Sequence, residues 1–182
     1  MKRLYETLPR SLKSLFSTDT SHPAYKMKRF LSEENLEKPD LCSNCGYCCR
    51  HCGCAFSPYD FEDLSFQALL DELSKGQISI SVLDKKSLEH FKKDILYLRM
   101  RNVGAPIVDT AKDRKGSACV GLKEDGCMFD FDHRPFGGQY LLPHVEDDRL
   151  ACVAIYSPEE CAKEWAPYQK VLKRLARQFP NN

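Results

Sequence analysis

The sequence lacks any apolar run that approaches the ~20 residues needed to cross a bilayer. It also lacks a charge bias: 27 Lys and Arg residues against 26 Asp and Glu residues leave a net charge of +1, so nucleic acid is disfavoured as a partner. The first residues, MKRLYETLPRSLKSLFS, contain no continuous apolar segment and no small-residue cleavage site, so we expect no signal peptide. These absences predict a cytoplasmic protein without a membrane partner, in a compartment that keeps thiols reduced.

Sequence signatures of common enzyme classes are missing as well. There is no Gly-rich phosphate loop of the P-loop or dinucleotide type, no catalytic-triad signature and no internal repeat. The sequence therefore names no catalytic residue and no protein partner, and it leaves open whether the protein is an enzyme.

Cysteine is the residue that the chain has in excess. Six of its ten cysteines fall within thirteen residues, in the run CSNCGYCCRHCGC, and these six are our candidate metal ligands: Cys42, Cys45, Cys48, Cys49, Cys52 and Cys54. Cysteines three apart allow a tight turn to direct two thiolates at one ion, as in structural zinc and iron–sulfur loops. Gly46 suits such a turn because glycine tolerates positive φ angles.

Two other interpretations of the cluster stay open. Disulfides need an oxidising compartment, and pairing at such short spacing strains the separation of the two Cα atoms. Buried cysteines that only fill a core are common, but they do not gather six to a short run. Metal ligation is the interpretation that we favour.

The adjacent cysteines Cys48 and Cys49 make a geometric prediction. In an extended segment neighbouring side chains leave on opposite faces, so the two sulfurs seldom reach one ion. We therefore expect Cys48 to join Cys42 and Cys45, and Cys49 to serve a second centre or the core.

A second pair of cysteines, Cys119 and Cys127, flanks a turn at Asp125-Gly126. An Asp-Gly corner favours a tight hairpin or knuckle, which would bring two more sulfurs to the cluster. Buried thiols that bind nothing are the alternative here. The roles of Cys152 and Cys161, as ligands or as core residues, stay open, although Cys161 lies on the apolar stripe of a predicted helix.

The combination of CxxCxxCC at residues 42–49, the later Cys119 and Cys127, and the following Arg134-Pro135 resembles the bacterial CxxCxxCC cysteine-cluster proteins, described as putative zinc- or iron-chelating domains. The resemblance covers roughly residues 40 to 150 and implies metal ligation by the cysteines at positions 42, 45, 48, 49, 119 and 127. Members of that family commonly have a further cysteine soon after the Arg-Pro pair, and this chain has RPFGGQYLLP there instead. The family has no general activity, so the resemblance implies a site and not a biological role.

The run after residue 133 is a candidate cofactor-binding segment. Gly137 and Gly138 would allow a backbone to approach a ligand or metal loop closely, and Arg134 could bind an anion or neutralise metal-bound thiolates. A simple turn, with Arg134 paired to a nearby acid, is the interpretation that we favour for this segment.

Periodicity and capping signals predict the regular elements. Helices should begin at Ser57-Pro58 and at Ser157-Pro158, the first ending at Gly76 and the second running to Pro180, with one or two helical turns over 87–93. Strands are expected over 77–82, 95–103 and 107–110. Together they predict a small, irregular, metal-stabilised α+β domain, with helices and a short antiparallel sheet around the cysteine loops. We divide the chain into an N-terminal arm at 1–40, a cysteine-cluster domain at 41–156 and a packed C-terminal helix at 157–182.

The function expected from the sequence is binding of zinc or iron through the cysteine cluster, with metal ions as the partner. The alternative is an iron–sulfur redox protein or a metal-dependent enzyme, because Cys42, Cys45, Cys48 and Cys52 also fit the ferredoxin spacing C-x2-C-x2-C-x3-C. Gly53 stands where that motif has proline, and the run is not repeated. Thiolate-rich sites accept zinc, ferrous iron and iron–sulfur clusters, so the sequence does not name the metal or its number.

Overall fold

The computed structural model describes residues 46–51, 53–114, 116–124, 126–130, 133–146, 149–154 and 156–180. Its centre is a three-stranded sheet in the order β2-β1-β3. Strand β1 (Ile78–Leu83) pairs antiparallel with β2 (Ile95–Met100), and β3 (Val108–Asp109) joins β1 in parallel. The predicted α+β class and all three strand positions are confirmed. The sheet is mixed and not purely antiparallel, because the loop after β2 carries the chain past the beginning of β1, so that β3 runs in the direction of β1.

A cysteine-bearing segment extends this sheet along the outer edge of β2. Ala55 forms an antiparallel bridge with Arg99. On either side of this bridge the amide of Phe56 donates to the carbonyl of Leu98, and the amide of Met100 donates to the carbonyl of Cys54, both over 2.9 Å. The sheet therefore fixes the backbone of Cys54 directly.

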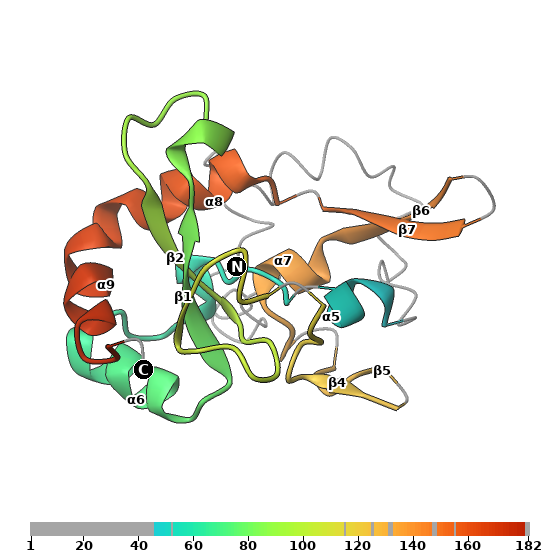
Figure 1. The fold of residues 1–182 in the computed structure, drawn as a ribbon, viewed down its shortest axis with the longest axis horizontal. Coiled ribbons are helices and arrows are strands. Elements are labelled where there is room, and N and C mark those ends of the chain that lie inside the picture. The colour runs from blue at the N-terminus through green and yellow to red at the C-terminus, as the bar shows by residue number, and fades with distance from the viewer. Residues whose placement is uncertain are drawn as a thin grey trace, which may run out of the picture.

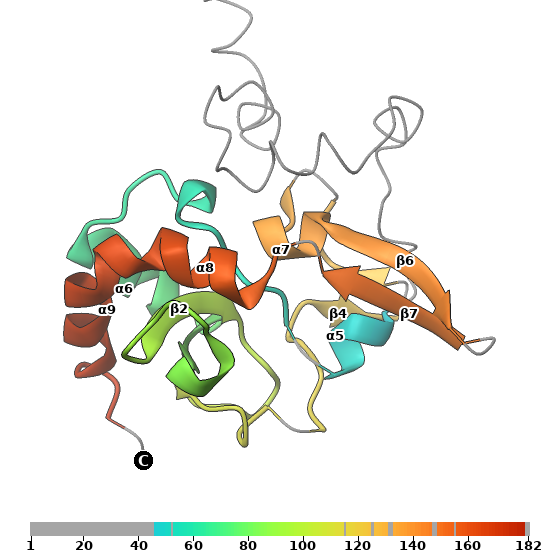
Figure 2. The same cartoon turned by 90° about the horizontal axis from the view of Figure 1, so that it is seen from above.

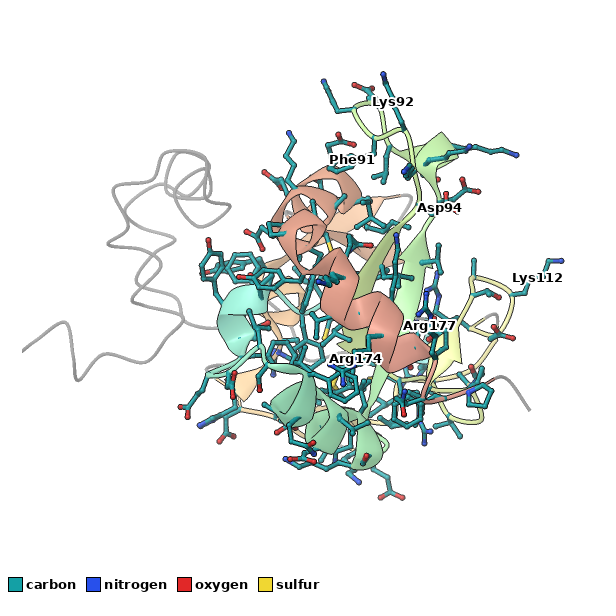
Figure 3. The ribbon with its side chains drawn as sticks, turned by 90° about the vertical axis from the view of Figure 1, so that its left-hand side faces the viewer. Phe91, Lys92, Asp94, Lys112, Arg174 and Arg177 are labelled. Carbon is teal, nitrogen blue, oxygen red and sulfur yellow. The ribbon has the colours of Figure 1, made fainter. Side chains whose placement is uncertain are left out.

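Three helices gather around one end of the sheet and form the apolar core with it: α6 (Phe66–Ser74), α8 (Pro158–Trp165) and α9 (Gln169–Ala176) (Figure 1). Figure 2 shows α8 lying along β2, with α6 and α9 beside each other. Trp165 is fully buried, and its indole Nε1 donates to the carbonyl of Phe56 over 2.8 Å. Arg174 of α9, which Figure 3 labels, lies over the ring of Phe66 at 3.9 Å and so covers the contact between α9 and α6.

The two long helices predicted from the sequence are each interrupted. The capping box at Ser57 is present, but it begins only a 3₁₀ turn, η1 (Pro58–Asp60), and α6 starts later with Ser65 as its own N-cap. Between them the chain stays extended so that Phe61 can pack edge-on against Trp165. The C-terminal helix is divided into α8, η4 (Ala166–Tyr168) and α9, because Pro167 has no amide to continue the α-helical hydrogen bonds.

The helical turns expected over 87–93 are wrong. A 3₁₀ turn, η2 (Lys85–Ser87), is capped by Asp84 and ends at Ser87, the first residue of that range. Asp94 accepts the amide of Lys85 over 3.0 Å and closes the connection between β1 and β2. Figure 3 labels Lys92 near the tip of this connection and Asp94 where it enters β2.

The other end of the molecule carries smaller elements around the cysteines (Figure 1). They are the helices α5 (Tyr47–His51) and α7 (Phe136–Gln139), and two antiparallel hairpins formed by β4 (Leu122–Lys123) with β5 (Gly126–Cys127) and by β6 (Leu141–Glu146) with β7 (Arg149–Ala154). The hairpin predicted at Asp125-Gly126 is confirmed, and Gly126 has a φ of +119°. Among the described residues, no helix combines the length and the apolar character that a membrane crossing requires.

Candidate metal centre

Cys54 lies where the sheet meets the small elements. It sits at the edge of β2, and its carbonyl is held by Met100. The preceding Gly53 lies so close to Met100 that a Cβ atom there would come within 2.3 Å of the Met100 carbonyl oxygen. Because only glycine allows this approach, the chain can leave α5 and enter the sheet at once. The result is a cysteine with a fixed backbone at the end of the motif.

Cys49 reaches the same place from α5. This helix begins after Gly46, whose φ of +71° agrees with the positive φ predicted for the turn, and whose carbonyl accepts the amide of Arg50 over 3.0 Å. The extended geometry predicted for Cys48 and Cys49 is wrong, because both are helical residues. Neighbouring side chains on a helix still leave in different directions, about 100° apart. That Cys48 and Cys49 serve different centres therefore remains a prediction, which now follows from helical and not from extended geometry.

Cys119 is brought to α5 by a backbone hydrogen bond. Its amide donates to the carbonyl of Cys49 over 2.6 Å. It also forms an antiparallel bridge with Asn102, just beyond β2, so the segment is held on both sides. Its side chain is buried, with 5% of its surface exposed.

Cys127 is positioned by the β4–β5 hairpin. It pairs with Leu122, and the amide of Leu122 donates to the carbonyl of Cys119 over 3.1 Å. Leu122 also packs close to Gly46, where an added Cβ would lie 3.1 Å from its Cδ1 atom. The hairpin is thus packed against the start of α5. This contact places Cys127, and Cys119 just before the hairpin, near α5.

The pKa of the Cys54 thiol is shifted by burial and by three other cysteines. Loss of solvation raises the pKa of the Cys54 thiol well above its ordinary value. The charges that Cys119, Cys49 and Cys127 would carry as thiolates raise this pKa further. Cys54 therefore interacts electrostatically with three other cysteines, which come from a helix, a loop and a hairpin.

One sulfur also receives a backbone hydrogen bond. The amide of Gly121 donates to Sγ of Cys119 over 3.4 Å. Amide donors directed at cysteine sulfur occur in metal-binding loops, where they stabilise thiolate charge. This contact stabilises negative charge on the sulfur of Cys119.

The predicted cofactor-binding segment covers the cluster. Gly137 donates its amide to the carbonyl of Ala55 over 2.9 Å, and a Cβ on Gly138 would come within 3.0 Å of Sγ of Cys54. Arg134 is 8% exposed and donates through Nε to the carbonyl of Phe129 over 3.3 Å. The glycine pair thus approaches the cysteine segment closely, and it does so in the short helix α7 and not in the predicted turn.

The remaining predicted ligands divide into two groups. Cys42, Cys45 and Cys52 lie outside the described residues, and of Cys152 only its place in β7 is described. Cys161 is a core residue, 3% exposed in α8, where burial raises its thiol pKa to about 12. Of the two roles left open for Cys161, the structure shows the core one.

The described residues do not by themselves complete a metal site. Within them, no group of three or more His, Cys, Asp or Glu side chains is arranged to hold an ion. The donor chemistry nevertheless fits a thiophilic metal, since Cys49, Cys119 and Cys127 all interact electrostatically with Cys54, and Cys42, Cys45 and Cys52 belong to the same motif.

The structure adds two buried charged residues that we did not predict from the sequence. Arg99 and Asp109 are 2% and 0% exposed, and Arg99 donates through Nη2 to the carbonyl of Gly53 over 3.0 Å. A charged residue in the apolar strand ILYLRM was the available signal. The partner of Arg99 could not be predicted from the nearby sequence, because Asp109 comes close to Arg99 only when β3 and β2 pair with β1.

Comparisons with known proteins add no relative. No family model, curated protein or solved structure matches the chain. The resemblance to the CxxCxxCC proteins therefore rests on the motif alone and stays a prediction.

Proposed function

We propose that this protein binds zinc or iron through a cysteine-lined centre in the cytoplasm. The observation that carries the proposal is that backbone hydrogen bonds and strand pairing hold the segments of Cys49, Cys119 and Cys127 together, and that these three cysteines interact electrostatically with Cys54. The other ligands in the proposal are the remaining cysteines of the motif: Cys42, Cys45, Cys48 and Cys52.

Electrostatics explain why a cation would be favourable at this location. Without one, burial and mutual repulsion oppose the ionisation of Cys54. A divalent ion removes the repulsion and replaces the lost solvation, so the cysteines would lose their protons as the metal binds. The amide of Gly121, which donates to Sγ of Cys119, favours the same charge state.

An iron–sulfur centre is the second candidate. The ferredoxin-like spacing from Cys42 to Cys52 supports it, and so does the amide donated to Sγ of Cys119, because hydrogen bonds to sulfur tune such clusters. This second candidate would include redox or enzyme activity at the metal. The first candidate, binding of zinc or iron, requires neither activity.

Metal counting on single variants tests the proposed site. Cys54→Ser and Cys119→Ser should each lose most of the metal that the wild-type protein retains. Cys161→Ser is the matched control, because it removes a buried thiol from the core and should leave the metal-to-protein ratio unchanged. Equal ratios in all four proteins would contradict the proposed ligands.

The same measurement separates the roles of the adjacent cysteines. If two centres exist, Cys49→Ser should empty the one that contains Cys54, while Cys48→Ser spares it. In a single polynuclear cluster either substitution removes all of the metal.

A further inference from the structure

A buried network of charged side chains lies across strands β1, β2 and β3 of the sheet. Asp109 accepts a hydrogen bond from Ser81 and one from Nη1 of Arg114, over 3.2 Å. Nη1 of Arg99 lies 3.5 Å from the other carboxylate oxygen, and neither of these two atoms has a hydrogen bond to any described residue. Two arginines therefore share one buried carboxylate.

Arg99 connects this network to the first cysteine segment. Its Nη2 donates to the carbonyl of Gly53, the residue before Cys54. Its backbone is bridged to Ala55, the residue after Cys54. Side chain and backbone of one buried arginine thus hold both sides of the cysteine at the centre of the site.

Arg114 connects the network to the second cysteine segment. Its carbonyl accepts the amide of Ser117 over 3.3 Å and the hydroxyl of the same serine over 3.4 Å. The carbonyl of Ser117 accepts from the side-chain amide of Asn102, and Asn102 is in turn bridged to Cys119. Asp109 is the point at which the paths to Cys54 and Cys119 meet.

Burying charged groups is unfavourable unless their ion pairs and hydrogen bonds have good geometry. Removing charges from water costs several kcal/mol per ion, and apolar residues of similar volume often stabilise a fold as well or better. A role in fixing the relative position of two segments accounts for charges at this place, since a carboxylate with two guanidinium groups imposes distances that apolar packing does not.

We infer that Arg99 and Asp109 are positioning residues for the cysteine centre, which set the segment of Cys54 against that of Cys119. This inference rests on the proposed function, because the relative position of Cys54 and Cys119 affects metal binding only if both are ligands. It assigns to the network a task that the metal alone would otherwise perform, namely holding the two segments together before the ion arrives.

Alkylation of the metal-free protein tests the positioning itself. Iodoacetamide labelling, followed peptide by peptide with mass spectrometry, gives separate rates for Cys54, Cys119 and the core residue Cys161. In Arg99→Lys and Asp109→Asn, we expect Cys54 and Cys119 to react about tenfold faster than in the wild type, with Cys161 unchanged. Because Asp109→Asn leaves buried arginines without their counter-ion and could prevent folding, Arg114→Gln, whose side chain is 19% exposed, serves as the milder variant.

The control is Asp113→Asn. This exposed carboxylate lies in the same loop and interacts weakly with the charge of Arg114, but its hydrogen bonds come from the amide and hydroxyl of Thr110, both over 2.7 Å, and not from a residue that binds Asp109. It should leave the rates at Cys54 and Cys119 as they are. Wild-type rates in Arg99→Lys and Arg114→Gln, an increase at only one of the two cysteines, or an equal increase at Cys161 would each overturn the inference.

Zinc affinity separates this inference from the proposed function. With zinc and a competing chromophoric chelator, the positioning variants should bind zinc about 10- to 100-fold more weakly, as is typical when residues that support metal ligands are changed. If the wild type binds no zinc or iron while the variants still alkylate faster, the proposed function fails and the positioning role stands. If the wild type binds metal and the variants match it in affinity and in alkylation rates, the proposed function stands and the positioning role fails.

Discussion

The amide of Cys119 donates a hydrogen bond to the carbonyl of Cys49 over 2.6 Å and so joins two cysteine segments that are far apart in the sequence. A backbone bond of this kind does not depend on the metal. It places Cys49 of α5 beside the segment that leads into the β4–β5 hairpin, whether or not an ion is bound. The fold therefore brings the sulfurs of both segments into one region by its own hydrogen bonds.

Substitutions of the glycine pair should separate stability from metal binding. A Cβ on Gly138 would lie 3.0 Å from Sγ of Cys54, so Gly138→Ala should displace the sulfur and lower the metal content. A Cβ on Gly137 would instead lie 2.8 Å from the carbonyl oxygen of Ala55, so Gly137→Ala should break a backbone contact and lower the free energy of unfolding by about 1–3 kcal/mol. Metal analysis and urea unfolding on both variants check this. A Gly138→Ala protein with wild-type metal content would show that Cys54 is not a close ligand.

Removing the metal should loosen only one end of the molecule. The apolar core lies around β1, β2 and the helices α6, α8 and α9, whereas the cysteine segments contribute few large apolar residues. Thiolate sites contribute on the order of 10 kcal/mol in zinc-finger peptides, so their loss should release the segments that they hold. We expect trypsin to cleave faster after Arg50 and Lys123 once a chelator has removed the metal.

Cleavage after Lys85 and Lys86 supplies the control for that digestion. These exposed residues belong to the connection between β1 and β2, at the opposite end of the sheet. Their rate of cleavage should not change. Unchanged cleavage after Arg50 and Lys123 in a verified metal-free protein would show that the metal does not stabilise this end.

The stability of the core should depend on pH through Glu164. Burial raises the pKa of this carboxyl, although hydrogen bonds from Ser57 and Tyr156, over 2.7 and 2.8 Å, act in the opposite direction. A raised pKa means that the folded state holds the proton more tightly than the unfolded state. The contribution of Glu164 is therefore fully present below the ordinary carboxyl pKa and is lost as pH rises through the higher pKa of the folded protein.

Glu164→Gln removes this dependence. Between those two pKa values, the free energy of unfolding of the wild type should fall relative to that of the variant as pH increases. Urea unfolding at a series of pH values from about 4 upward measures the difference. Parallel curves for the two proteins would contradict the shift.

Local chemistry made much of the fold predictable. Both capping boxes, at Ser57 and Ser157, are present, and the alternation in ISISV identified β1. The Asp-Gly corner between Cys119 and Cys127 identified the hairpin. Each of these signals acts over a few residues, so no tertiary contact was needed to interpret it.

The errors have tertiary causes, with one exception. The helix expected after Ser57 stops because Phe61 packs against Trp165, a residue far along the chain. The ion pair of Arg99 with Asp109 exists only after the sheet has formed. Pro167 is the exception, since its effect on the C-terminal helix was local and could have been predicted. The convergence of Cys49 and Cys54 with the hairpin depended on the fold in the same way as the ion pair.

The central claim is that the cysteines bind metal, and the composition of the purified protein tests it most directly. Protein purified anaerobically without chelator should contain at least one equivalent of zinc or iron per chain by elemental analysis. A colourless sample with zinc supports the first candidate function, and a brown sample with acid-labile sulfide supports the iron–sulfur centre. Repeated preparations of folded protein with neither zinc nor iron would contradict the account.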